Sequence, residues 1–302
     1  MQGVAAMLLG VAASCAVGLC CSRPHATPAE ASSTTAQPAP PDDRIQYGPG
    51  PLQFGHLRLP RGAGPFPVVV FIHGGCWLSQ YDISDVADLE QAIANAGFAI
   101  WSLEYRRLGD DGGGWPGTFT DIARGADYLR VLAPRYALDL TRVVASGHSA
   151  GGQLALWLAA RRKIPAASEL HATDPIGIGG VLALAPAADL EGVQASGECG
   201  GVAGRLMGGS PADHPDRYAA ASPMQLAPIA VPQVLVVGAH DDTWGPYGRS
   251  YFARARAAGD TSVELVVAPQ AGHFELISPK TTTWPIVIGA LKSLFARIGG
   301  AR

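Results

Sequence analysis

The sequence predicts an α/β fold, a mostly parallel central sheet with helices on both faces and a lid-like insertion. Three observations lead to this fold class. Short continuous apolar runs recur along the chain, which is typical of strands buried on both faces. Segments with helical apolar spacing separate these runs, as in βαβ units. Hydrophobic residues make up 48% of the 302 residues and charged residues 16%, so neither disorder nor a coiled coil fits.

The predicted strands follow one another at the spacing that crossover helices need. They are residues 67–72, 98–103, 142–146, 180–184, 233–237 and 263–267. Between the first two, Val86, Leu89 and Ile93 repeat at i, i+3 and i+7, and a last apolar helix is expected over 286–298. Right-handed crossovers would place such helices on both faces of the sheet.

One stretch interrupts this alternation. Residues 189–232 are rich in turn residues and have only weak helical periods. A long insertion between strands of such a sheet is usually a lid or a pocket wall, and the alternative is a surface excursion without a role. We refer to residues 189–232 as the insertion. Residues 44–302, which include it, have the size of one large α/β domain.

The amino end differs in kind from this domain. Residues 1–21 are almost entirely small and apolar, which favours a secretory signal of the lipoprotein type, although no basic residue precedes the apolar run. Cys15 and Cys20 match a lipoprotein cleavage site imperfectly, so lipid attachment stays open, as does an Ala-rich helix docked on the domain. Residues 22–43 are rich in Pro, Ala, Ser and Thr, as in a disordered tether. We therefore expect export to the periplasm or the cell exterior, with a membrane tether if a cysteine is lipidated.

The charge balance and the motifs exclude several classes of protein. The 22 Lys+Arg and 25 Asp+Glu give a net charge of −3 with no basic stripe, so nucleic-acid binding is not expected. No Cys/His cluster has zinc spacing, and no Gly-rich loop carries the Lys of a P-loop. We therefore expect neither a metal nor another cofactor, and the oligomeric state stays open.

The residues 147–151, GHSAG, carry the first element of a catalytic site. We call this segment the GHSAG turn. It fits the G-x-S-x-G pattern and lies between a predicted strand and an apolar helix, the context in which the serine is held on a sharp turn with its hydroxyl exposed. Ser149 is therefore the candidate nucleophile. The alternative is a Gly-rich turn without catalytic function.

A serine hydroxyl needs a neighbouring base, and the base needs a carboxylate to orient it. Asp241 and Asp242 follow the predicted strand 233–237, and His273 follows the strand 263–267. Both loops lie at carboxyl ends of strands, where open parallel sheets bind ligands. The order Ser, Asp, His is the one expected when a G-x-S-x-G serine begins the triad.

The residues 73–77, HGGCW, follow the first predicted strand and supply the third element. We call this segment the HGGCW loop. Its glycines let backbone N–H groups point into a cleft, so Gly75, Cys76 and Ala150 are the candidate oxyanion-hole donors. Trp77 is expected to line the wall of the pocket, and His73 is expected to fix the loop by hydrogen bonds.

These motifs together resemble a known family. From about Tyr47 to Arg297, the chain resembles α/β-hydrolases of the esterase/lipase group with an HGG-x-W loop, which includes hormone-sensitive-lipase-like carboxylesterases, acyl-sugar esterases and kynurenine formamidases. The matching landmarks are HGGCW, LEYR at 103–106, Asp121, DLTR at 139–142, GHSAGG at 147–152, YAAASP at 218–223, GAHDD at 238–242 and AGHFEL at 271–276. The resemblance implies hydrolysis of a small-molecule carboxylic ester, or of a formamide, by a metal-free acyl-enzyme route.

The resemblance also bears on the acid. Such hydrolases commonly carry it three residues after the Gly that ends the strand, which implies Asp241 rather than Asp242. Asp189 is a third candidate, because some hydrolases of this fold take the acid from an earlier loop.

Two positions depart from the family. Cys76 stands where the hormone-sensitive-lipase-like pattern prefers a third Gly. In the loop after the acid, the chain has Trp244-Gly245-Pro246 where many relatives place an aliphatic residue directly before Pro.

Other polar residues near the motifs are interpreted as structural. Glu104 and Arg106 are expected to form a buried ion pair, and Asp139 and Arg142 are expected to form a turn before a strand.

Cys76 and Cys199 are the only cysteines in 44–302, and export would allow them to pair. Pairing needs Cα atoms within about 7 Å, which a sequence does not reveal, so it stays open.

Three functions are compatible with these residues. The leading one is a serine esterase acting on small acyl esters. The second is an aryl formamidase or another amide hydrolase, which would use the same residues. The third is a non-catalytic binding protein with this fold, although such proteins usually lack the serine or the histidine. A prolyl-type exopeptidase is disfavoured, because no propeller-like repeat precedes the hydrolase domain.

Overall fold

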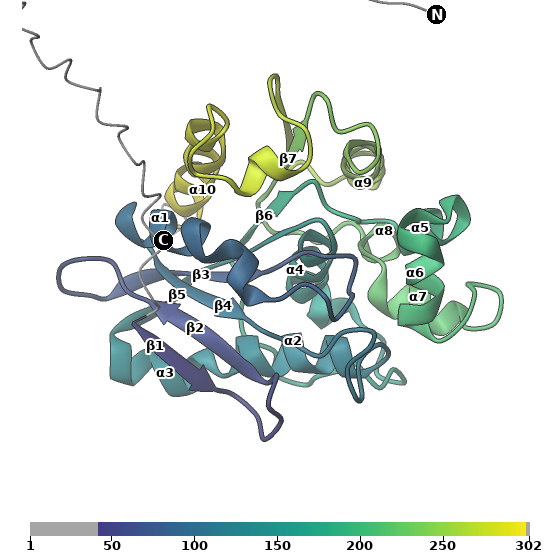
Figure 1. Ribbon diagram of the computed structural model, residues 1–302, viewed down its shortest axis with the longest axis horizontal. Coiled ribbons are helices and arrows are strands. Elements are labelled where there is room, and N and C mark those ends of the chain that lie inside the picture. The colour runs from purple at the N-terminus through teal and green to yellow at the C-terminus, as the bar shows by residue number, and fades with distance from the viewer. Residues whose placement is uncertain (1–41, 300–302) are drawn as a thin grey trace, which may run out of the picture. The chain divides into compact units, whose positions relative to one another are not determined.

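A computed structural model describes residues 42–299, which are built around one eight-stranded sheet with the order β1-β2-β4-β3-β5-β6-β7-β8 (Figure 1). The strands are β1 (Asp43–Gln46), β2 (Phe54–Arg58), β3 (Phe66–Ile72), β4 (Ala99–Leu103), β5 (Leu138–His148), β6 (Gly180–Leu184), β7 (Gln233–Gly238) and β8 (Val263–Ala268). From β4 to β8 every neighbouring pair is parallel, whereas β1 and β2 pair antiparallel with their neighbours. The predicted mostly parallel sheet is confirmed.

The six predicted strands are all present, and the two antiparallel strands are additions to them. β1 is mostly exposed and β2 contains a Gly and ends in a charged Arg58, so neither forms the continuous apolar run that marks a buried strand. β5 begins four residues before the predicted start, because its first residues lie at a half-buried margin of the sheet. The predictions for residues 1–41 lie outside the described residues.

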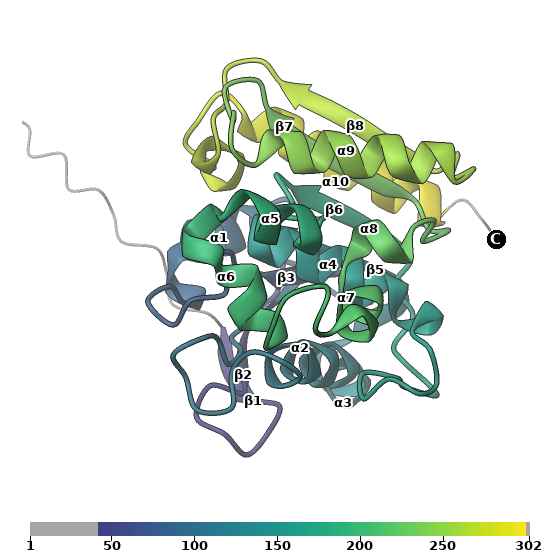
Figure 2. The ribbon, with the colours of Figure 1, turned by 90° about the vertical axis from the view of Figure 1, so that its right-hand side faces the viewer.

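Helices cover both faces of the sheet, as expected. They are α1 (Ala87–Asn95), α2 (Gly117–Asp127), α3 (Leu129–Tyr136), α4 (Ala150–Ala160), α9 (Gly245–Ala257) and α10 (Trp284–Gly299). In Figure 1, α1 and α10 lie together on one side of the sheet, with α2 and α3 on the opposite side. Phe98, just after α1, stacks on Phe295 of α10 with ring centroids 4.6 Å apart. Figure 2 shows α9 and α10 on opposite faces of β7 and β8.

Three short 3-10 helices connect these elements, namely η1 (Ile83–Val86), η2 (Arg161–Lys163) and η3 (Phe274–Ile277). The insertion contains four more helices, α5 (Leu190–Ser196), α6 (Glu198–Met207), α7 (Pro215–Ala221) and α8 (Pro223–Leu226), which gather at the right of Figure 1.

The insertion explains why α4 is apolar all round. A helix that packs on a sheet alone keeps a polar outer face. α4 has almost no exposed residue, because the sheet covers one side and α7 with α8 cover another. Gln153 and Trp157 of α4 donate side-chain hydrogen bonds to the backbone oxygens of Ala221 and Ala220, at 2.9 and 3.0 Å. Ser149, which precedes α4, is therefore held by a helix that is buried on all sides.

Candidate active site

The GHSAG turn joins β5 to α4 at the carboxyl edge of the sheet. Ser149 has φ 57° and ψ −118°, a conformation that an L-residue adopts only when its surroundings enforce it. Gly151 allows the turn, because a Cβ at that position would lie 2.0 Å from the backbone oxygen of Ile72. The Ser149 N–H donates to Leu184 O at 2.9 Å, which ties the turn to β6. The strand-turn-helix context predicted for Ser149 is present.

The loops after β7 and β8 bring Asp241 and His273 together. His273 Nδ1 lies 2.7 Å from Asp241 Oδ2, and the N–H of Trp244 donates to the other carboxylate oxygen at 2.9 Å. Burial raises the pKa of Asp241, but the hydrogen bonds from His273 and from backbone N–H groups outweigh it and hold the pKa below its ordinary value. Asp241 is therefore an ionised acceptor that fixes the proton of His273 on Nδ1.

The two other candidate acids lie elsewhere. Asp242 is exposed to solvent. Asp189 caps α5, where its carboxylate accepts the N–H of Gly192 at 3.0 Å. Of the three carboxylates, Asp241 alone contacts His273 in the part of the chain that is described.

The HGGCW loop follows β3, the strand next to β5. The N–H groups of Gly75 and Cys76 donate to no backbone or side-chain acceptor within residues 42–299. Both residues line the same cavity as Ser149, and the N–H of Ala150 is the first of α4 and so has no partner within the helix. Of the three predicted donors, Gly75 and Cys76 therefore line the same cavity as Ser149, whereas Ala150 is buried directly after Ser149 and is not itself a lining residue.

His73 fixes this loop, as expected. Its Nδ1 lies 2.9 Å from Gly74 O and its Nε2 lies 3.2 Å from Glu104 Oε1. Burial raises the pKa of Glu104, but its bonds to His73 and the charge of Arg107 outweigh this and lower the pKa. The predicted ion pair of Glu104 with Arg106 is wrong. Glu104 pairs with Arg107 at 3.1 Å, and Arg106 points the other way to Asp121 at 2.7 Å.

The expectation for Trp77 is also wrong. Its side chain is fully buried, its indole N–H donates to Gln153 Oε1 at 3.2 Å, and it does not line the cavity. Trp77 instead anchors the HGGCW loop in the core. Asp139 and Arg142 form an ion pair at 2.6 Å, but both lie inside β5, so the predicted turn before the strand is wrong.

The cavity beside Ser149 and His273 has a volume of about 310 Å³. Its walls come from the segment around η1, from η3 and from the loop after Asp241. The lining side chains there are Tyr81, Asp85, Val86, Trp244, Phe274 and Ile277. Phe274 is 69% exposed, which places an aromatic ring at the mouth. The cavity is mostly apolar, with one carboxylate on its wall.

No part of the insertion lines this cavity within the described chain, so its expected role as a pocket wall is wrong for this site. The insertion reaches the site in another way. Cys199 of α6 forms a disulfide with Cys76 of the HGGCW loop, which settles the pairing that the sequence left open.

His148 is a residue that the sequence analysis passed over. Its ring centroid lies 4.3 Å from that of His273, and its Nε2 donates to the backbone oxygen of His273 at 2.9 Å. Burial, together with the nearby His273, lowers the pKa of His148 to about 3, so its ring is neutral. The position next to the serine in G-x-S-x-G was the only available signal. His148 ties the GHSAG turn to the histidine loop.

The model of a family described as BD-FAE matches residues 57–256, about two thirds of the chain. The chain belongs to the BD-FAE family. The match includes Ser149 and Asp241, whereas His273 lies beyond it. The predicted resemblance to α/β-hydrolases of the esterase group is confirmed by this membership.

The following relatives of this BD-FAE member share about a quarter of its residues or fewer. It is similar to Esterase LipC of Mycobacterium tuberculosis (strain ATCC 25618 / H37Rv), with 26% identity over 249 residues, or 79% of this chain. The aligned region spans 61% of Esterase LipC, so the chain matches about three fifths of that relative's length.

Solved structures share the fold at low identity. Esterase B from Lactobacillus rhamnosis (HN001) has a TM-score of 0.70 and 22% identity, covering 86% of this chain and 88% of its own. A truncated carbohydrate esterase from gut microbiota has a TM-score of 0.73 and 16% identity, covering 86% and 98%. These similarities confirm the fold class of the BD-FAE member.

Two features are absent from residues 42–299. They contain no group of three or more His, Cys, Asp or Glu side chains placed to hold a metal ion. None of their helices combines the length and the apolar character that crossing a membrane requires.

Proposed function

We propose that this protein is a serine hydrolase that cleaves carboxylic esters of small, uncharged acyl substrates through an acyl-enzyme intermediate. The observation that carries the proposal is the convergence on one cavity of a strained serine, an Asp-bound histidine and unpaired backbone N–H groups. Membership of the BD-FAE family and the similarity to Esterase LipC support an ester as the bond that is cleaved.

In the proposed acylation step, the Ser149 hydroxyl attacks the carbonyl carbon of the ester. The neutral His273 accepts the hydroxyl proton on Nε2, because Asp241 keeps the other proton on Nδ1. The ionised Asp241 then stabilises the imidazolium that forms, and His273 donates its new proton to the departing alcohol. The product of this step is an ester on Ser149.

The developing oxyanion needs hydrogen-bond donors that are already in place. The N–H groups of Gly75, Cys76 and Ala150 are the candidates. Gly75 and Cys76 line the cavity, and their N–H groups have no protein acceptor within residues 42–299. Ala150 follows Ser149 directly and begins α4, so its N–H has no partner within the helix. A single donor of this kind contributes about 10²- to 10³-fold to the rate. Water, activated by His273, then attacks the acyl-Ser149 ester and releases the acid.

The cavity lining supports an apolar and uncharged substrate. Tyr81, Val86, Phe274 and Ile277 offer apolar surface, whereas Asp85 places a negative charge on the wall. A carboxylate on the substrate would approach the like charge of Asp85, which is exposed to solvent, so the repulsion is screened but unfavourable. We therefore expect neutral esters to be preferred over esters that carry an anionic group.

We also propose that the protein is exported and acts outside the cytoplasm. Residues 1–21 have the composition of a secretory signal. The disulfide between Cys76 and Cys199 adds support, because such bonds form and persist in oxidising compartments. Fractionation of cells that express the full chain, with the sequence of the mature amino end, tests this proposal; an unprocessed protein in the cytoplasm would contradict it.

The catalytic proposal is tested with a series of p-nitrophenyl esters of increasing acyl length. We expect turnover of short acyl chains to be highest, because the cavity holds about 310 Å³. A monoester of succinate, matched in length to a neutral ester, tests the effect of Asp85, and Asp85→Asn should narrow the difference between the two. Ser149→Ala is the inactive control in each assay.

An amide-hydrolase function and a binding function predict different results in the same series. Faster turnover of N-formyl aryl amides than of aryl acetates would replace the esterase proposal with a formamidase. Absence of turnover on every ester, in a folded protein that also resists a fluorophosphonate probe, would favour a binding protein.

A further inference from the structure

The backbone of the HGGCW loop is held in an unfavourable conformation. Gly75, Cys76 and Trp77 have φ values of 103°, 53° and 53°, so three consecutive residues lie in the left-handed region. Only Gly adopts this region without cost, and the other two residues need the surrounding structure to enforce it. What holds each of them therefore decides where the N–H groups of the loop point.

Trp77 has strong anchors on the core side. Its indole N–H bonds to Gln153, its backbone oxygen accepts the N–H of Leu108 at 2.8 Å, and its side chain is fully buried. The N–H of Leu78 closes the turn onto Gly75 O at 2.9 Å. These contacts fix the end of the loop that faces the core.

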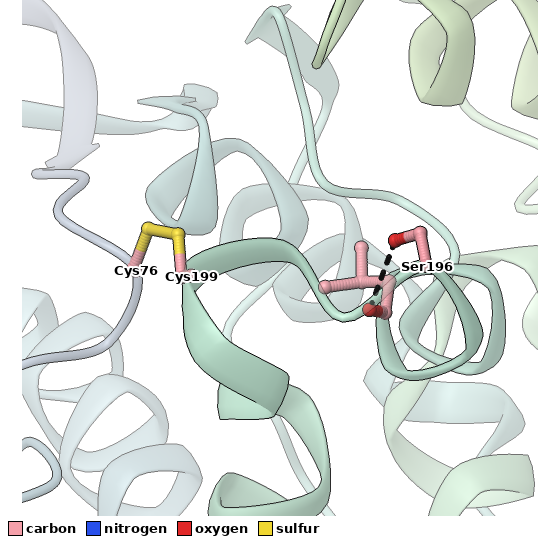
Figure 3. The surroundings of a disulfide bond; sticks show 4 residues. Cys76, Ser196 and Cys199 are labelled. Carbon is pink, nitrogen blue, oxygen red and sulfur yellow. Dashed lines mark hydrogen bonds between the residues drawn. A yellow bond between two sulfur atoms is a disulfide. The ribbon is translucent and has the colours of Figure 1, made fainter.

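Cys76 has a different anchor. Its side chain is half-buried and forms a disulfide with Cys199, which is 123 residues away in the sequence and has its Cα 6.4 Å from that of Cys76 (Figure 3). The bond crosses from the HGGCW loop to α6 of the insertion. It is the covalent contact that holds the middle residue of the strained segment.

The segment around Cys199 does not form a rigid wall by itself. Cys199 and the two glycines that follow it break the helical geometry of α6, with φ values of 50°, 70° and 69°. Nothing lies within 4 Å of a Cβ built on Gly200 or Gly201. The insertion is fixed on both sides of this segment, by the buried Val193 and Val202. The disulfide therefore joins the HGGCW loop to a body that is anchored close by.

We propose that Cys199 is a positioning residue for the oxyanion hole: through the disulfide it holds the Cys76 N–H toward the reacting carbonyl. This inference rests on the proposed esterase function. Loss of the bond frees Cys76 to leave its left-handed conformation and turns its N–H away from the cavity. The substrate contacts on the cavity walls stay in place, because they come from η1, η3 and Trp244.

The main test is Cys199→Ala, assayed with the best aryl ester. We expect kcat to fall by about 10- to 100-fold, a part of the 10²- to 10³-fold effect of a lost donor, while KM changes less than about threefold. An arylboronic acid, which adds to the serine as a tetrahedral anion, should bind more weakly by the same factor as kcat. Its affinity reports the oxyanion hole, which a general loss of structure would not change selectively.

Two controls accompany this variant. Ser196→Ala removes a hydroxyl of the same insertion that bonds to Val193 O and Tyr247, and does not contact Cys76 (Figure 3). It should keep the wild-type kcat. Dithiothreitol breaks the disulfide of the wild type by giving two electrons and two protons, so that two thiols form and the reagent becomes a cyclic disulfide. Reduction should lower the wild-type kcat to the value of Cys199→Ala and leave that variant unchanged.

The proposal is overturned if the folded Cys199→Ala protein, or the reduced wild type, keeps its kcat and its affinity for the boronic acid. It is also overturned if KM rises as much as kcat falls, since the bond would then hold the substrate cleft. Reduction of the wild type supplies the test if Cys199→Ala does not fold. An inactive wild type would instead contradict the proposed function, which separates the two failures.

Discussion

Two segments of the site, the GHSAG turn and the HGGCW loop, follow neighbouring parallel strands and carry the same kind of strain. Ser149 has φ 57° and Cys76 has φ 53°, and each conformation costs about 1–3 kcal/mol in a residue other than Gly. They differ in what supports them. The GHSAG turn is enclosed by β3, β6 and α4, whereas the HGGCW loop depends on distant side chains and on one covalent bond.

The comparison shows that the two segments of the site are positioned in different ways. The nucleophile is held by the packed core, so damage to its support is expected to damage the fold. The oxyanion donors lie in a loop fixed by single contacts, so damage there is expected to change the rate and leave the fold intact. The variants below test this distinction, from the largest expected effect to the smallest.

Ser149→Ala should lower the esterase kcat by more than about 10⁴-fold without changing the fold, because it removes the atom that forms the acyl bond. Activity is measured with an aryl ester, and the fold by circular dichroism. Ser146→Ala is the matched control, since Ser146 is buried on β5, the strand that leads to Ser149, and its hydroxyl has no partner among the described residues. Wild-type activity in a folded Ser149→Ala protein would remove Ser149 from the mechanism.

Asp241→Asn should lower turnover by about 10⁴-fold, because the amide no longer holds the proton on His273 Nδ1. Asp242→Asn, which changes the exposed neighbour, should stay within a few-fold of the wild type. The two variants are compared at saturating substrate. If Asp242→Asn were the inactive one, the geometry of this loop would be wrong by one residue.

Gly151→Ala tests whether the GHSAG turn is part of the core. Its Cβ would lie 2.0 Å from the backbone oxygen of Ile72, which cannot move without displacing β3. We expect the free energy of unfolding to fall by about 3 kcal/mol or more, which corresponds to a Tm lower by about 6–12 °C. Gly177→Ala is the control, because its Cβ would meet nothing within 4 Å. Equal Tm values for the two variants would show that the turn tolerates movement.

His148 gives the smallest effect, in the pH dependence of stability. Its pKa is about 3 in the folded protein, because burial disfavours the charged ring, and about 6.5 in an unfolded chain. Between these values the unfolded state binds the extra proton, so stability rises with pH by up to about 1.4 kcal/mol per unit. His148→Gln keeps an N–H donor but does not titrate. Below pH 6.5 its stability should therefore change less steeply with pH than that of the wild type, and above pH 6.5 the two slopes should be equal. If the free energy of unfolding of the two proteins depended on pH in the same way from pH 7 to pH 5, His148 would not be a buried, neutral residue in the GHSAG turn.

The sequence predicted the parts of the molecule whose residues are constrained locally. Strands β3 to β7 are largely buried on both faces and form apolar runs, and β8 keeps an apolar run at the sheet edge although Glu264 and Val267 are exposed. The glycines around Ser149 mark a turn that needs them. β1 and β2 lie toward an exposed edge and carry no such signal. Trp77 was misplaced because its partner, Gln153, lies 76 residues away on α4. The walls of the cavity were missed for the same reason, since η1 and η3 meet only in the folded chain.

The central claim, that Ser149 is an activated nucleophile, is tested most directly with a fluorophosphonate probe. The probe reacts rapidly with a serine whose hydroxyl is activated by a neighbouring base. We predict that intact-protein mass spectrometry finds one adduct per chain, that peptide mapping places it on Ser149, and that Ser149→Ala abolishes it. A folded protein that remains unlabelled, or that is labelled at another serine while Ser149 stays free, would contradict the account.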